Sequence, residues 1–157
     1  MGLPRFDPVP HGVTLLELQA QDCRRESLAG YESALRSLRI SFTRDRNTLR
    51  LATGGAITVA LVANGAIDLW ADRPHSKGIP YIDYTWPCAV KVRDFSRIVP
   101  VRSGTVIAAV DDFPVAIKRR AGRGTLIVLG SPLGPALWAG DAEARRWVGA
   151  VLQQTHR

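Results

Sequence analysis

Apolar positions at helical spacing mark two segments of the chain. In the first, Leu28, Tyr31, Leu35 and Leu38 recur along one face, which predicts a helix over about 25–38. The second has a broader apolar stripe and predicts a helix over 142–153, with Asp141 as its N-cap. Its stripe is formed by Ala144, Trp147, Val148, Val151 and Leu152.

Between these helices the apolar positions come in short runs separated by turn residues, a pattern typical of β-strands. A further short run, 13–18, precedes the first helix. Asn64-Gly65 separates two of the runs and predicts an antiparallel hairpin, because both central residues of such a turn favour positive φ. The predicted strands are 13–18, 39–43, 48–52, 56–63, 66–71, 90–92, 98–101, 106–110 and 115–118.

The run Thr125–Leu129 differs from these strands because it is apolar at every position after its threonine. A strand buried on both faces has this composition, as in the middle of a parallel or mixed sheet covered by helices. The residues Gly130–Pro135 then predict a loop between this strand and the last helix. This strand, loop and helix predict an α/β domain over 12–157, with the proline-containing residues 1–11 as an extended arm.

Composition adds a basic charge to this picture. The chain has 157 residues, 46% of them hydrophobic, and a net charge of +7. That charge fits nucleic-acid binding. It also fits a GC-rich coding bias, because 18 of the 21 basic residues are arginine and most are scattered. One dense cluster, Lys118–Arg123, follows a predicted strand, where a solvated turn is the alternative interpretation.

Targeting and cysteine signals are weak. The apolar runs are far shorter than the roughly 20 residues that span a bilayer. The first residues lack the apolar core of a secretion signal, so we expect a cytoplasmic protein without membrane contact. Cys23 and Cys88 are too isolated for a metal knuckle or a disulfide framework, and we expect partly buried free thiols and no metal or other cofactor.

The last third resembles the end of class I glutamine amidotransferase-like domains. The matching features, in order, are Pro114-Val115, the turn Gly122-Arg123-Gly124, the strand from Thr125 to Gly130, and the helix from Asp141. The resemblance covers about 50 to 60 residues. It implies a flavodoxin-like, mixed or mostly parallel sheet with flanking helices, to which the residues add the antiparallel hairpin. In such domains the strands over 98–110 would form the preceding pair.

The residues depart from that family where its chemistry lies. Catalytic members hold a nucleophilic cysteine in a Gly-x-Cys-x-Gly elbow, and neither Cys23 nor Cys88 has this context. They also carry a His-Pro-Glu-like dyad after the late strand, where this chain has Ser131-Pro132-Leu133. We therefore predict no glutamine hydrolysis and assign no catalytic residue.

Three groups remain as candidate ligand contacts. Ser131 and the backbone of Leu133-Gly134 follow the buried strand, at the edge where open α/β sheets bind ligands. The predicted loop containing Asp72 and His75 offers a polar pair, too small by itself for a metal site. The third is the aromatic segment, in which Trp86 is the ligand candidate.

The aromatic segment contains Trp70, Tyr81, Tyr84 and Trp86, which would serve as a stacking platform, as core, or as a subunit contact. In a regular strand Tyr81 and Tyr84 face opposite ways, whereas Tyr84 and Trp86 share a face.

These observations favour a non-catalytic, amidotransferase-like domain that binds a small ligand or a protein partner. Two alternatives stay open. One is a hydrolase-type enzyme that uses Asp72, His75 and Ser131, and the other is a basic nucleic-acid-binding protein. Unprotected sheet edges or the aromatic segment would also permit a homodimer.

Overall fold

In the computed structural model, which describes residues 12–62, 81–92 and 98–153, the described strands assemble into one mixed sheet. The described helices are α1 (Arg24–Ser37), α3 (Gly134–Trp138) and α4 (Ala142–Gln153). The nine strands are β1 (Val13–Gln19), β2 (Phe42–Asp45), β3 (Thr48–Leu51), β4 (Gly55–Leu61), β5 (Ile82–Tyr84), β6 (Val90–Val92), β7 (Thr105–Val110), β8 (Phe113–Ala121) and β9 (Gly124–Leu129).

The strand order is β2-β3-β4-β1-β9-β8-β7-β5-β6, and the parallel pairs lie at its centre. β1 runs parallel to β4 on one side and to β9 on the other. The remaining described pairs are antiparallel. All of them except β5 with β7 join consecutive strands, and short turns can connect only antiparallel neighbours. The sheet is therefore mixed; the alternative of a mostly parallel sheet is wrong.

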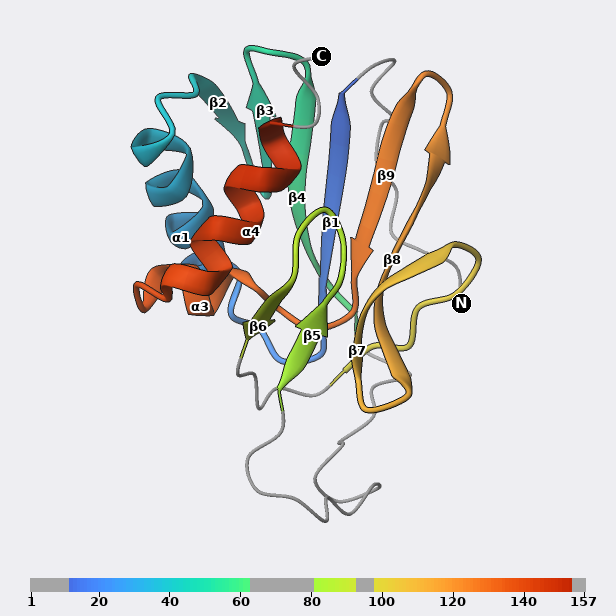
Figure 1. Ribbon diagram of the computed structural model, residues 1–157. Helices are drawn as coiled ribbons and strands as arrows, with labels where there is room; N and C mark the ends of the chain where they lie inside the picture. Colours follow the sequence, from blue (N-terminus) through green and yellow to red (C-terminus); the bar gives the residue numbers. More distant parts are fainter. Residues whose placement is uncertain (1–11, 63–80, 93–97, 154–157) are drawn as a thin grey trace.

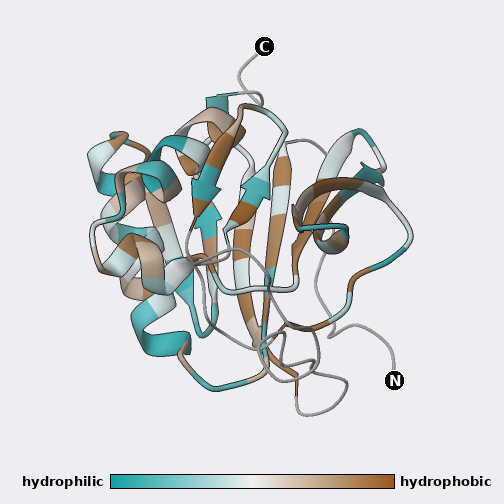
Figure 2. Ribbon diagram, turned by 60° about the horizontal axis from the view of Figure 1, so that its bottom comes forward, coloured by the Kyte–Doolittle hydropathy of each residue, from teal (hydrophilic) through white to brown (hydrophobic). Residues whose placement is uncertain are grey.

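The two faces of the sheet are covered differently. The described helices α1, α3 and α4 lie on one face (Figure 1), and their buried residues share one core cluster with that face of the strands. A second cluster on the opposite face contains Leu16, Leu126 and Val128, with Val99 and Val101 from the segment before β7. In Figure 2 the central strands are mostly hydrophobic, whereas the helices carry more hydrophilic positions.

β9 confirms the prediction of a strand buried on both faces. Ile127 and Leu129 belong to the helix-side core, whereas Leu126 and Val128 belong to the opposite cluster. All four are at most 1% exposed. Because β9 lies between β1 and β8, its backbone is paired on both edges as well.

Both predicted helices form. α1 buries Leu28, Tyr31 and Leu35, and α4 buries its whole apolar stripe. The Asp141 carboxylate accepts hydrogen bonds from the backbone N–H groups of Glu143 at 2.8 Å and Ala144 at 3.1 Å. This geometry confirms the predicted N-cap, since these N–H groups have no partner within the helix.

Several predicted boundaries are wrong. β2 begins at Phe42 rather than at residue 39, because α1 is followed by Arg39 with a φ of 58°. Residues 98–101 form no regular strand; Ile98 makes a single bridge, and Val99 donates a hydrogen bond to Gly130. The short helix α3 occupies part of the predicted loop, with Pro135 near its start, where a missing N–H costs nothing.

β8 starts at Phe113, two residues before the predicted strand 115–118. Pro114 lies opposite Ala109, where the register of β7 shifts. Such an irregularity accommodates a proline, which has no N–H to give to the ladder. The predicted hairpin at Asn64-Gly65, the strand 66–71 and the arm 1–11 lie outside the described residues.

Candidate functional site at the carboxyl edge of the central strands

Glu17 is a fully buried carboxylate near the carboxyl end of β1, the central strand of the parallel group. Its register neighbours are Val59 on β4 and Leu129 on β9, both in the helix-side core. The side chain therefore lies under the helices between two apolar neighbours. A charge in such a place is costly unless hydrogen-bond donors surround it.

Glu17 has these donors. Its Oε1 atom accepts hydrogen bonds from the Tyr31 hydroxyl at 2.6 Å, the Leu133 N–H at 2.7 Å and the Gly134 N–H at 2.9 Å. These groups belong to α1 and to the start of α3. One carboxylate thus connects β1 with both helices, and hydrogen bonds to a charged acceptor are stronger than neutral ones.

Gln19 extends the network on the same face of β1. Its Nε2 atom donates to Glu17 Oε2 at 2.9 Å and to Ser27 Oγ at 2.7 Å. Its Oε1 atom accepts from the backbone N–H of Cys23 at 3.0 Å, just before α1. The side-chain amide therefore uses its acceptor and both donors within the protein. We call Glu17, Gln19, Ser27 and Tyr31 the Glu17 network.

Glycine allows α1 and α3 to approach each other over this network. A Cβ atom at Gly134 would overlap Ser27 of α1, and one at Gly30 would overlap the carbonyl oxygen of Gly134. The close contact of the two helices leaves the Glu17 network without solvent exposure at Glu17, Gln19, Ser27 or Tyr31.

Burial also changes the acidity of Tyr31. Burial of the ring, followed by the charge of Glu17 and the hydrogen bond to it, raises the pKa of the Tyr31 hydroxyl well above 10. The hydroxyl therefore stays protonated at neutral pH and donates to the carboxylate. In contrast, Asp22 is exposed, and the side-chain hydrogen bond from Arg24 lowers its pKa to about 2.

The structure brings three of the predicted ligand contacts to this edge. Ser131 is 2% exposed, and Leu133 is also buried. The backbone N–H groups of Leu133 and Gly134, predicted to face a ligand, donate to Glu17. A side chain of the protein thus occupies the position that an anionic ligand of this loop would take. Ligand binding here stays a prediction.

Trp86 lies elsewhere, beyond the end of β5. Tyr84 is buried and its ring centroid lies 4.8 Å from that of Trp147, whose Nε1–H donates to the Trp86 carbonyl oxygen at 2.8 Å. Trp86 also packs against the helix-side core, so it shares a face with Tyr84 as predicted, while Tyr81 is 39% exposed. The Nζ atom of Lys118 lies 4.0 Å from the centroid of the Trp86 ring.

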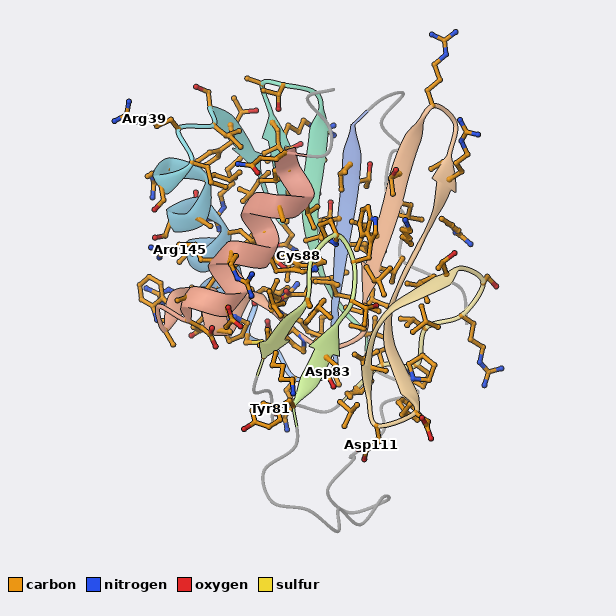
Figure 3. All side chains as sticks on the ribbon, in the orientation of Figure 1. Arg39, Tyr81, Asp83, Cys88, Asp111 and Arg145 are labelled. Carbon is orange, nitrogen blue, oxygen red and sulfur yellow. The ribbon has the colours of Figure 1, made fainter. Side chains whose placement is uncertain are left out.

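Of the remaining candidate residues, the structure describes Cys23 and Cys88. Asp72, His75 and Trp70 lie outside the described residues. Cys23 and Cys88 are partly buried, as predicted, and they are not joined in a disulfide. Figure 3 labels Cys88, which follows β5, whereas Cys23 precedes α1. Within the described residues, no group of three or more His, Cys, Asp or Glu side chains is arranged to hold a metal ion.

The sequence interpretation missed the Glu17 network, although a signal for it was present. The predicted strand 13–18 reads Val-Thr-Leu-Leu-Glu-Leu, apolar on both faces except for its threonine and glutamate. A glutamate in a strand buried on both faces must find donors from the covering helices. Leu15, Glu17 and Gln19 alternate, which places the two polar side chains on one face.

Comparison with known proteins identified no relative of this chain. Neither a family model nor a curated protein sequence matches the chain. Among the residues that the structure describes, no helix has both the length and the apolar character needed to cross a bilayer.

Proposed function

We propose that this chain is a non-catalytic, amidotransferase-like α/β domain that binds a small ligand or a protein partner. The flavodoxin-like part of the proposal is supported by the central parallel strands β4, β1 and β9. It is also supported by the order of β8, β9 and α4, which follows the motif order of the resemblance. Fold alone does not determine function, so the site carries the argument.

The observation that carries the proposal is the hydrogen bonding of Glu17. In open α/β sheets, ligands bind at the carboxyl ends of the strands, where loops and helices present backbone N–H groups. Here the N–H groups of Leu133 and Gly134 are used by Glu17, and Ser131 is buried. These groups lie at the edge of the sheet where open α/β folds bind ligands, but here they connect β1 to α1 and α3.

The proposal predicts no turnover at this edge. Purified protein is incubated with L-glutamine, with release of ammonia as the readout, and with an activated ester, with release of the phenol. We expect both rates to equal those of buffer, because neither Cys23 nor Cys88 has the Gly-x-Cys-x-Gly context of the catalytic members, and Ser131-Pro132-Leu133 stands where those members carry their base.

Three variants make the result decisive. Cys23→Ala, Cys88→Ala and Ser131→Ala each remove one nucleophile of the described chain. Release of either product by the native protein, with a loss of at least ~100-fold in one of these variants, would show that the domain is catalytic. Rates equal to those of buffer in all four proteins support the proposal.

A further inference from the structure

The hairpin of β8 and β9 concentrates positive charge at its turn. Lys118, Arg119, Arg120 and Arg123 lie within six residues, and no Asp or Glu occurs in the sequence between Asp112 and Asp141. We call these four residues the hairpin cations. Arg119, Arg120 and Arg123 are exposed. The ion pairs of the described residues involve other arginines, and none joins a hairpin cation to a described carboxylate.

The hairpin cations lie on both faces of the ribbon. Arg119 is opposite Leu126, which belongs to the core cluster away from the helices. Lys118 is opposite Ile127, which belongs to the helix-side core, and Arg120 shares that face because side chains alternate along a strand. Arg123 is in the turn between the strands. Positive charge therefore surrounds the end of the hairpin.

This end of the hairpin extends past its neighbour. The first residue of β7, Thr105, pairs with Lys118, so β8 continues from Arg119 to Ala121 without β7 beside it. Figure 1 shows the β8–β9 turn beyond the end of β7. At the base of this segment, Lys118 is held over the Trp86 ring. On its other edge, β9 is paired with β1 from Thr125 onward, so the two-stranded end without a neighbouring strand comprises Ala121 to Gly124, with Arg119 and Arg120 at its base.

We propose that the β8–β9 hairpin binds duplex DNA by entering the major groove. That groove is about 12 Å wide and admits a two-stranded β-ribbon, with a phosphate backbone on each side. Cations on both faces of a ribbon suit this geometry, whereas a flat anionic membrane would meet only one face or the turn. The groove of A-form RNA that lies between the corresponding phosphates is too narrow for side chains to read.

The roles of the hairpin cations follow from their positions. Arg119 and Arg120 face opposite backbones, and an arginine can give two parallel hydrogen bonds to one phosphate. Arg123, in the turn, is the cation that reaches furthest into the groove. Because phosphate contacts carry no sequence information, we expect strong salt dependence and little sequence preference. This proposal concerns a surface other than the Glu17 network and does not depend on the absence of catalysis.

The test is binding of the full chain to a fluorescent duplex DNA of about two helical turns, measured by anisotropy between about 50 and 200 mM salt. The hairpin variant carries Arg119→Gln, Arg120→Gln and Arg123→Gln. We expect it to bind at least ~10-fold more weakly at low salt. Its slope of log affinity against log salt should be shallower by about 3, since each phosphate contact contributes about 0.9.

A matched control removes the same charge elsewhere. It carries Arg25→Gln, Arg39→Gln and Arg46→Gln, which are exposed in α1, after α1 and in the β2–β3 turn. Figure 3 labels Arg39 near α1 and β2, away from the β8–β9 turn. We expect this control to lose less than ~3-fold in affinity and to keep its salt slope.

Three outcomes would overturn the proposal. The first is no binding of the native chain to duplex DNA at low salt. The second is an equal loss in the hairpin variant and the control, which would mean attraction by net charge alone. The third is equal or tighter binding of duplex RNA or of anionic phosphatidylserine vesicles through the same arginines. The hydrolysis assays, run on the same protein, remain independent of all three.

Discussion

The carboxyl edge of the central strands and the β8–β9 hairpin differ in the burial and the partners of their polar side chains. At the carboxyl edge, Glu17 and Gln19 are fully buried, and their side chains bond to donors and acceptors from β1, α1 and the start of α3. At the end of the hairpin, the arginines are exposed and have no described carboxylate beside them. The first region satisfies its polar groups internally, and the second does not.

Because of this difference, we expect the carboxyl edge to contribute to stability and the hairpin to contribute to binding. A buried charge with several donors is costly to disturb, because the donors lose their partner and water cannot replace it. An exposed cation contributes little to folding, and its hydrogen-bonding capacity stays available to another molecule. Substitutions in the Glu17 network should therefore change stability, whereas substitutions in the hairpin should change binding.

The largest effect is expected for Glu17→Ala. It leaves the Tyr31 hydroxyl and the N–H groups of Leu133 and Gly134 buried without their acceptor. We expect a loss of about 3–5 kcal/mol in the free energy of unfolding, measured by urea denaturation. Glu17→Gln should cost less, about 1–3 kcal/mol, because its carbonyl oxygen still accepts hydrogen bonds.

Glu26→Ala provides the control for this experiment. Glu26 is exposed in the first turn of α1, so its removal should change the free energy of unfolding by less than about 0.5 kcal/mol. If Glu17→Ala were as mild as Glu26→Ala, the Glu17 network would not fasten the helices to the sheet.

Tyr31→Phe should have the next largest effect. It removes a 2.6 Å hydrogen bond to a carboxylate but keeps the buried ring, so we expect a loss of about 1.5–3 kcal/mol. It should also change the pH dependence. Because burial raises the pKa of Tyr31, the native state keeps its proton above about pH 10, where the unfolded state loses it.

The direction in which pH changes the stability follows from the protons bound in the two states. Where the unfolded state binds fewer protons, stability falls as pH rises, so the contribution of Tyr31 is complete below about pH 10 and is lost above it. In Tyr31→Phe this alkaline loss should be smaller. Tyr81→Phe, which removes a hydroxyl from an exposed tyrosine, is the control variant for this measurement. A profile of Tyr31→Phe identical to that of the native protein would contradict the expectation.

The elements that the sequence predicts well are those with a strong local signal. The continuous apolar run of β9, the stripe of α4 and the Asp141 cap depend on residues close in the chain, and the structure confirms all three. The strand order is not local. The sequence pattern does not predict that β1 lies between β4 and β9, because the strand order depends on contacts between distant segments.

The candidate site, too, could be predicted only in part from the sequence. The sequence points to the loop of Ser131, Leu133 and Gly134, and this loop does lie at the carboxyl edge of the central strands. Its interaction with Glu17 spans more than a hundred residues of chain, so spacing cannot reveal it. The polarity of Glu17 inside an apolar strand is visible in the sequence, but the identity of its donors depends on how α1 and α3 pack.

The smallest effect on stability is expected for the hairpin variant with Arg119→Gln, Arg120→Gln and Arg123→Gln. These side chains are exposed, so each substitution should change the free energy of unfolding by less than about 0.5 kcal/mol. Relief of repulsion among neighbouring cations could even give a small gain. Urea denaturation at low salt measures both. A loss above about 2 kcal/mol would mean that the cations stabilise the fold; stability equal to that of the native protein, together with lost DNA affinity, separates the two regions completely.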